Sequence, residues 1–139
     1  MDLNALETSF DLVAPKGDEL MEIFYADLFA AAPAVQPLFA GTDMQRQRSM
    51  LLAALGLLRR SLRNLDAILP ALQQMGARHV AYGAMPEHYP VVGQVLIGAM
   101  AKVAGPEWRP QYTAQWQSAF AIVAGAMIEG ADAELTIAA

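Results

Sequence analysis

The sequence predicts an all-α protein with about seven helical segments in one domain. Apolar residues recur at helical spacing along most of the chain, whereas the alternation typical of strands is nearly absent. Hydrophobic residues make up 55% of the composition, and the excess is mainly Ala, Leu and Met, which suit closely packed helices. A chain of 139 residues fits a single compact domain and is long enough to bury a sizeable core.

Breaking and capping residues divide the chain into these segments. We expect helices over about residues 3–13, 18–31, 33–39, 44–62, 64 or 66 to 82, 86 or 90 to 104, and 109–129. Pro15 and Gly17 interrupt the pattern after the first helix, and acidic residues open the second, where the helix dipole favours them. Pro33 and Pro37 bracket the short third segment, and Asp43 offers an N-cap for the fourth.

The later segments are bounded in the same way. Asn64 or Asp66 is expected to cap the fifth helix, because short polar side chains accept hydrogen bonds from the first turn. Pro86 or Pro90 is expected to open the sixth. The seventh is expected to stop at Gly130, since glycine commonly follows the last turn of a helix.

Charge and cysteine content exclude several classes of function. The net charge is −5 and no stripe of basic residues appears, so we expect no nucleic-acid partner. The longest basic cluster, Arg59, Arg60 and Arg63, is typical of a solvated helix edge. The absence of cysteine excludes disulfides, iron–sulfur clusters and thiol catalysis. Without a signal-like N-terminus or a membrane-length apolar run, we expect a cytoplasmic protein with no membrane contact.

His79 is the first candidate for chemistry. It lies on a predicted helix whose inward face includes Leu72, Met75 and Tyr82. Imidazole is the commonest side-chain ligand of haem iron, and the other ring N–H would reach the carbonyl of Met75 one turn earlier. A lone histidine on an apolar face is nevertheless more often part of the core.

The second histidine, His88, belongs to a segment that opens a helix and is expected at the surface or the rim of a site. A non-haem metal site built on both histidines would need a carboxylate ligand nearby. Glu87 is the only close candidate and its geometry is poor, so we do not favour such a site.

Tyr25 and Gln47 are polar residues on otherwise apolar helix faces. Met21, Leu28 and Phe29 surround Tyr25 at helical spacing. A buried tyrosine hydroxyl or amide must find a partner, and a backbone carbonyl would serve for Tyr25. Two polar groups aimed into an apolar bundle also suggest a ligand site.

The chain resembles bacterial single-domain globins of the three-on-three, thermophile type and the haem domain of flavohaemoglobins. The resemblance extends from about residue 3 to residue 130. It is carried by Tyr25, Pro33 to Leu38-Phe39, Gln47 with Leu51, Asn64-Leu65 with Leu69-Pro70, Arg78-His79, Pro86-Glu87-His88-Tyr89-Pro90-Val91-Val92-Gly93, Ala114-Gln115-Trp116 and Phe120.

This resemblance implies a globin fold around a haem b, with His79 as the proximal iron ligand. Phe39 would stack on the haem, and Tyr25 and Gln47 would be the distal hydrogen-bond donors. The resemblance places the other residues as follows: Leu51 as the distal wall, Tyr89 on the proximal side, Arg78 near a haem propionate or simply in solvent, and Leu38, Ala54, Val92 and Phe120 lining the pocket.

One position departs from the family. Flavohaemoglobins carry a glutamate on the last helix that joins the proximal tyrosine and histidine, and the matching residue here is Ala131. Glu129 and Asp132 are near in sequence but would face elsewhere. The departure argues against strong proximal activation, and with it against a peroxidase-like or fully committed dioxygenase role.

The resemblance therefore implies a protein that binds O₂, NO or CO. The first hypothesis is an NO dioxygenase that forms nitrate from O₂ and NO and relies on an external reductase. The second is an oxygen store or gas sensor without turnover, and the third is a haem-free interaction domain in which His79 is only core. We expect a monomer or a weak homo-oligomer.

Overall fold

The computed structural model describes residues 1–138, which are predominantly helical. The α-helices of this part of the chain are α1 (Leu3–Val13), α2 (Gly17–Ala31), α3 (Met44–Ser61), α4 (Leu69–Ala81), α5 (His88–Ala104) and α6 (Pro110–Ala138). Short 3-10 segments join them: η1 (Ala14–Lys16), η2 (Pro33–Phe39), η3 (Leu62–Ile68) and η4 (Gly105–Glu107). The all-α prediction is confirmed, and each of the seven predicted segments has a counterpart.

Two predicted boundaries are correct for the expected reason. The Asp43 carboxylate accepts hydrogen bonds from the backbone N–H groups of Gln45 and Arg46 and so caps α3. Asp18 and Glu19 occupy the first turn of α2. Side-chain capping and the helix dipole thus explain where these two helices begin.

Two other predicted boundaries are wrong. Neither Asn64 nor Asp66 caps α4, because the chain continues from α3 as the 3-10 segment η3 and kinks at Asn64. The helix α4 begins at Leu69 without a side-chain cap, and Pro70 lies in its first turn, where no intrahelical N–H is needed. Likewise, α6 does not stop at Gly130 but continues to Ala138.

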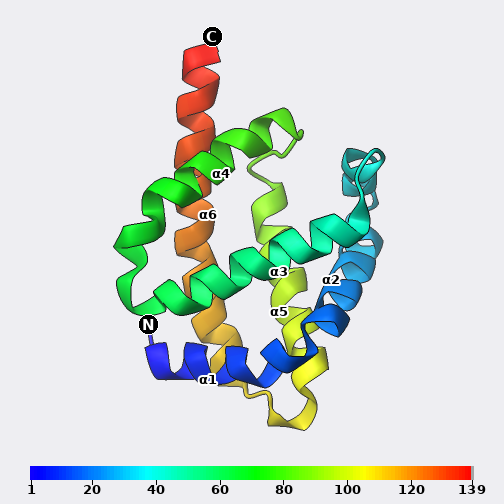
Figure 1. Cartoon of the computed structure of the whole chain (residues 1–139), viewed down its shortest axis with the longest axis vertical. Coiled ribbons are helices and arrows are strands. Elements are labelled where there is room, and N and C mark those ends of the chain that lie inside the picture. Colours follow the sequence, from blue (N-terminus) through cyan, green and yellow to red (C-terminus); the bar gives the residue numbers. More distant parts are fainter. Residues whose placement is uncertain (139) are drawn as a thin grey trace.

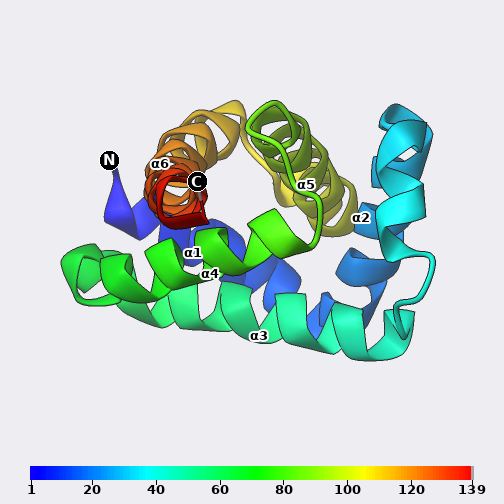
Figure 2. The same cartoon turned by 90° about the horizontal axis from the view of Figure 1, so that it is seen from above.

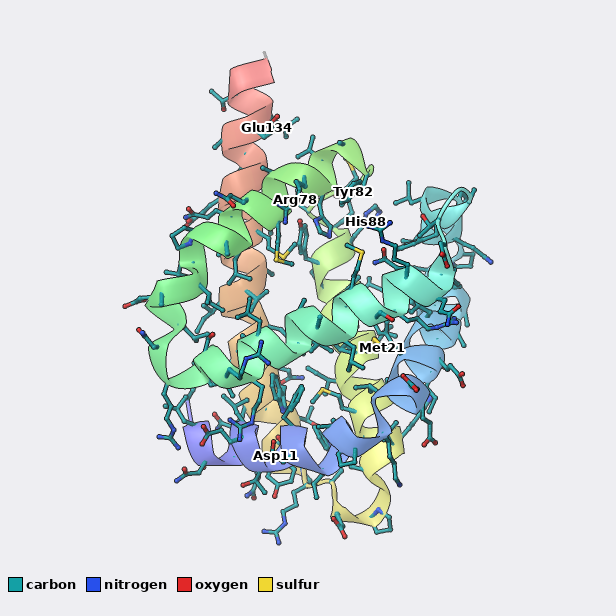
Figure 3. The ribbon with its side chains drawn as sticks, viewed as in Figure 1. Asp11, Met21, Arg78, Tyr82, His88 and Glu134 are labelled. Carbon is teal, nitrogen blue, oxygen red and sulfur yellow. The ribbon has the colours of Figure 1, made fainter. Side chains whose placement is uncertain are left out.

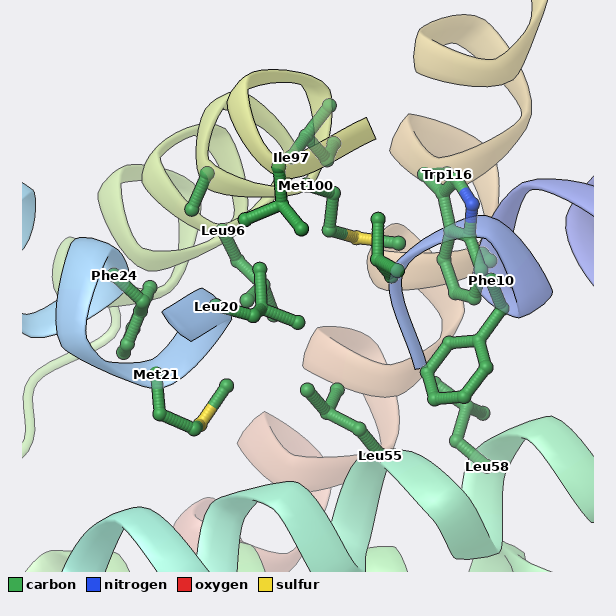
Figure 4. Packing of buried hydrophobic residues seen from close by; sticks show 14 of the residues in the cluster. Phe10, Leu20, Met21, Phe24, Leu55, Leu58, Leu96, Ile97, Met100 and Trp116 are labelled. Carbon is green, nitrogen blue, oxygen red and sulfur yellow. The ribbon is translucent and has the colours of Figure 1, made fainter. Parts of the chain in front are cut away.

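The helices form two crossed layers. In Figures 1 and 2, α3 and α4 lie on one side of the molecule and α5 and α6 on the other, with α1 crossing below and α2 at one end. The core lies where α1, α2, α3, α5 and α6 converge. Figure 4 shows this packing around Phe10, Leu20, Phe24, Leu55 and Trp116, of which Leu20 and Trp116 are almost completely buried.

The approach of α4 to α6 depends on two glycines. A Cβ atom on Gly76 would lie 1.8 Å from the backbone oxygen of Met127, and one on Gly130 would lie 1.8 Å from the backbone oxygen of Gln73. No side chain can occupy that space. Gly130 is therefore an interior helix residue where another backbone passes closely, rather than a stop signal.

The basic cluster on α3 is only partly solvated. Arg59 forms ion pairs with Glu7 and Asp11 of α1, and Arg63 pairs with Glu7. The prediction of a solvated helix edge was thus wrong for the half-buried Arg59, whereas Arg60 and Arg63 are exposed as predicted. Arg59 at the end of α3 and Arg63 in η3 connect this region to α1. Among residues 1–138, the structure has no helix that is long and apolar enough to span a membrane.

Candidate functional site

His79 lies near the C-terminal end of α4 and is half-buried. Its Nδ1 atom is 2.5 Å from the carbonyl oxygen of Met75, one turn earlier, as the sequence predicted. Since a carbonyl oxygen can only accept a hydrogen bond, Nδ1 carries the proton. The lone pair of Nε2 is consequently left available for a metal, and the backbone contact fixes both the tautomer and the orientation of the ring.

Tyr25 and Gln47 meet across the interface of α2 and α3. The Gln47 Nε2 amide donates a hydrogen bond of 3.1 Å to the Tyr25 hydroxyl oxygen, and the tyrosine side chain is only 5% exposed. The partner of the hydroxyl is thus an amide rather than the backbone carbonyl considered above. Because Tyr25 accepts this bond, its own O–H proton remains free to be donated to a ligand.

The phenol of Tyr25 stays protonated at neutral pH. Burial raises its pKa above the ordinary value, while the hydrogen bond from Gln47 and the positive charge of Arg48 act in the opposite direction. A protonated phenol and an amide N–H are both hydrogen-bond donors. The pair can therefore stabilise a small ligand that carries partial negative charge.

Aromatic packing connects this pair to η2. The ring of Tyr25 contacts that of Phe39 edge-on at a centroid distance of 5.9 Å, and Phe29 lies 5.5 Å from Phe39. Leu38, beside Phe39, is 41% exposed and lies over Gly83, where a Cβ atom would come within 2.9 Å of Leu38 Cδ2. Gly83 has a positive φ of 89°, a conformation that favours glycine. The segment after His79 therefore reaches η2.

The remaining predicted pocket residues come from four helices. Leu51, Val92 and Phe120 are half-buried and pack against the main core. Ala54 on α3 is half-buried, and Arg78, labelled in Figure 3, is exposed on α4. His88 is half-buried, and its Nδ1 accepts a hydrogen bond from the Met85 backbone N–H.

Tyr89, at the start of α5, lies next to α4 and α6. It packs against the small cluster of Leu72, Ala126 and Met127. Its hydroxyl is buried and has no hydrogen-bond partner among the described residues, and burial raises its pKa. Glu129 accepts a hydrogen bond from Gln73 instead. Among the described residues, no carboxylate therefore forms a hydrogen bond with the Tyr89 hydroxyl.

Tyr82 is placed differently from the prediction. The sequence pattern put it on the inward face of the helix, but α4 ends at Ala81 and Tyr82 is 57% exposed. Its ring contacts the ring of His79 edge-on at 5.3 Å between centroids. A spacing of three residues from His79 was the signal for this contact. Its exposure follows from the end of the helix, which the periodicity alone did not reveal.

These groups fit the haem that the resemblance implies. One imidazole offers an unprotonated nitrogen, and two donors on other helices are hydrogen-bonded to each other. Three large apolar side chains near this part of the chain are exposed: Leu38, Tyr82 and Met85. Within residues 1–138 no group of three or more His, Asp or Glu side chains gathers as a metal site.

Comparisons with known proteins agree with this arrangement. Residues 22–127 match the sequence profile of the Globin family. A flavohemoprotein from Bacillus thuringiensis is 31% identical over 128 residues, which are 91% of this chain and 31% of that protein. The chain thus spans about a third of the length of such relatives.

Two solved structures share the fold. An engineered carbene transferase from Rhodothermus marinus, whose parent is provisionally named a nitric oxide dioxygenase, superposes with a TM-score of 0.80 at 24% identity, with 97% of each chain covered. A bacterial globin from Campylobacter jejuni gives a TM-score of 0.80 at 23% identity, with 94% of each chain covered. The family match covers most of the helices described above, and the chain belongs to the globin family.

Proposed function

We propose that this chain acts as a single cytoplasmic globin domain, residues 1–139, that binds haem b and combines O₂ with NO to give nitrate. The observation that carries the proposal is the buried Tyr25–Gln47 pair, which presents a free phenolic proton. The flavohemoprotein relatives also support it. We propose that a reductase, acting as a partner of this domain, supplies the electrons that repeated turnover requires.

His79 is proposed to hold the iron through Nε2. The contact between Nδ1 and the Met75 carbonyl selects the neutral tautomer whose Nε2 lone pair is free, and it restricts rotation of the ring. When bound, haem supplies an iron centre at which diatomic gases bind and react. The protein supplies the orientation of the imidazole and the polarity of the opposite side of the pocket.

Tyr25 and Gln47 are proposed to retain the gaseous ligand. In a pocket with little water, each donor contributes about 1–2 kcal/mol to a ligand that carries partial negative charge. Two donors together slow its release by roughly 10–100-fold relative to an apolar pocket. Slow release keeps O₂ in place until NO arrives, and an O₂ molecule, an NO molecule and one electron give one nitrate ion.

The reaction is tested by mixing the O₂-saturated ferrous protein with one equivalent of NO and measuring nitrate. We expect nearly one nitrate per haem within the mixing time, followed by repeated turnover when a reductase and NADH are added. Nitrate formed only once, with no turnover under any reductase, would exclude the enzymatic proposal.

A second candidate, an oxygen store or gas sensor, is favoured by a specific observation. The Tyr89 hydroxyl has no partner and Ala131 provides no carboxylate, so electron donation through His79 lacks the support present in flavohaemoglobins. A globin of this kind would bind O₂ reversibly and oxidise slowly. Slow autoxidation combined with the absence of nitrate turnover would identify this alternative.

Removing the distal hydroxyl is expected to accelerate O₂ release. The Tyr25→Phe variant should raise the O₂ dissociation rate about tenfold or more, because it loses the free donor and the acceptor of the Gln47 amide. Gln47→Leu should raise the rate less. Stopped-flow displacement of O₂ by CO measures both. Tyr112→Phe, which removes a hydroxyl from a buried tyrosine of α6, is the matched control and should leave the rate unchanged. Unchanged rates in both distal variants would remove this assignment.

A further inference from the structure

Charge is strongly segregated along this chain. Residues 44–86 contain six arginines and one acidic residue, Asp66, whereas the other residues contain three basic and thirteen acidic residues. The net charge of −5 is therefore the sum of one positively charged stretch, residues 44–86, and an acidic remainder. That stretch includes all of α3 and α4, which lie on the same side of the molecule in Figures 1 and 2.

Part of this positive charge is neutralised and part is not. Arg59 and Arg63 are paired with the carboxylates of α1. The remaining arginines form no ion pair within residues 1–138, and all but the half-buried Arg48 are exposed: Arg46, Arg48, Arg60 and Arg78. We call the exposed residues Arg46, Arg60 and Arg78 and the surface between them the α3–α4 face. Arg48 is not part of it, because it lines a cavity with Asp18 and Glu22 of α2.

Apolar side chains are exposed on the same helices and next to them. Met50 and Leu57 of α3 are 56% and 38% exposed, and Tyr82 at the end of α4 is more than half exposed. Exposed apolar groups surrounded by arginine are common at protein–protein interfaces, where Arg, Tyr and Met are enriched. The composition of this face thus fits a protein partner.

The α3–α4 face also extends to residues that contact His79. Tyr82 is exposed at the surface while its ring touches the ring of His79. Arg78 and Tyr82, both labelled in Figure 3, lie one position before and three positions after His79 in the sequence. A partner bound at this end of the face would lie against the residues next to the proposed iron ligand.

We propose that the α3–α4 face is the docking surface for an acidic electron-transfer protein that carries a flavin or an iron–sulfur cluster. The inference rests on the proposed function in one respect: the ferric haem iron must be reduced again before each new turnover. Complementary charge accelerates association and orients the partners, and its effect weakens with salt. Long polyanions fit less well, because the rest of the molecule carries a net charge of −10 and repels them.

The first test measures reduction of the ferric haem-loaded protein by photoreduced flavodoxin in a stopped-flow instrument. One electron leaves the flavin hydroquinone and reduces ferric iron to ferrous. We expect the second-order rate constant to fall at least tenfold between about 20 mM and 500 mM salt. Reduced riboflavin, a small donor of low charge, should show a much weaker salt dependence, and the cation hexaammineruthenium(II) should react faster as salt is added.

Variants localise the effect. Arg46→Gln and Arg60→Gln should each lower the low-salt rate with flavodoxin about threefold, and the double variant about tenfold, without changing the rate with riboflavin. Arg109→Gln, outside the basic stretch and just before α6, is the matched control and should match the unmodified protein. Arg78 is not used here because the resemblance also places it near the haem.

A second readout does not depend on electron transfer. Titration with oxidised flavodoxin, followed by NMR of the ¹⁵N-labelled globin, should shift backbone amides of α3 and of the end of α4. The proposal would be overturned if the rate of reduction by flavodoxin did not depend on salt or on Arg46 and Arg60. It would also be overturned if the amide shifts were confined to other helices. Binding of a DNA duplex or phosphatidylglycerol vesicles under conditions where flavodoxin does not bind would overturn it as well. The single-turnover formation of nitrate is measured without a donor protein, so its failure can be distinguished from failure of the docking proposal.

Discussion

The Gly76→Ala variant is expected to lose about 3 kcal/mol of folding free energy. The added methyl group would lie 1.8 Å from the backbone oxygen of Met127, far inside contact distance, and a backbone atom cannot move aside as a flexible side chain can. The helices α4 and α6 must therefore separate. For a domain of this size the loss corresponds to a fall of roughly 10 °C in Tm. Thermal unfolding of the apoprotein, monitored by circular dichroism, measures it.

The chain provides a matched control for this substitution. Gly98 in α5 and Gly125 in α6 are helical glycines at which a Cβ atom would meet nothing within 4 Å. Alanine at either position should stabilise the protein by about 0.5–1 kcal/mol, because alanine restricts the unfolded chain and favours helix. If Gly76→Ala behaves like these two variants, the close approach of α4 to α6 is contradicted.

Gly76→Ala should also weaken haem retention. Gly76 lies one turn before His79 on α4, so a shift of this helix moves the imidazole away from its position. The rate of haem transfer to excess apomyoglobin measures retention. We expect faster transfer from Gly76→Ala than from Gly98→Ala. Equal transfer rates would indicate that the position of α4 does not control the site.

The His79→Gly variant is expected to lose tight haem binding altogether. The sequence contains one other histidine, His88, whose Nδ1 accepts a hydrogen bond from the Met85 backbone N–H. A cofactor that binds only the folded state stabilises it, by about 2.7 kcal/mol when present at one hundred times its dissociation constant. The gain in Tm that haemin gives the unmodified protein should therefore be absent from the variant.

Free imidazole is expected to restore the lost ligand. The glycine leaves a space that the small molecule can enter, and haem binding should recover as imidazole is added. His88→Ala is the control and should bind haem normally without imidazole. A His79→Gly protein that retains haem as tightly as His88→Ala would contradict the assignment of the iron ligand.

Much of the helical organisation could be predicted because its signals are local. Asp43 caps α3 through its own side chain, and the prolines at 33 and 37 define η2 by restricting their own backbone. Errors arose where the cause is not local. A glycine is typical of a helix end, yet Gly130 lies inside α6, where the backbone of α4 passes against it. A contact between residues 57 positions apart leaves no periodic trace in the sequence.

The candidate site was predictable to a similar degree. The contact of His79 with Met75 follows from helix geometry, and the inward positions of Tyr25 and Gln47 follow from their apolar neighbours. That the two distal residues would bond to each other depends on the crossing of α2 and α3. The partnerless hydroxyl of Tyr89 and the exposure of Tyr82 depend likewise on how separate elements end and pack.

Titration of the purified apoprotein with haemin, followed by absorption and resonance Raman spectroscopy, tests most directly whether His79 binds iron. We expect a Soret band that saturates at one haem per chain and, after reduction, an iron–histidine vibration. A chain that stays without a Soret band, or a ferrous spectrum that lacks the iron–histidine vibration, would show that the imidazole of residue 79 is not an iron ligand.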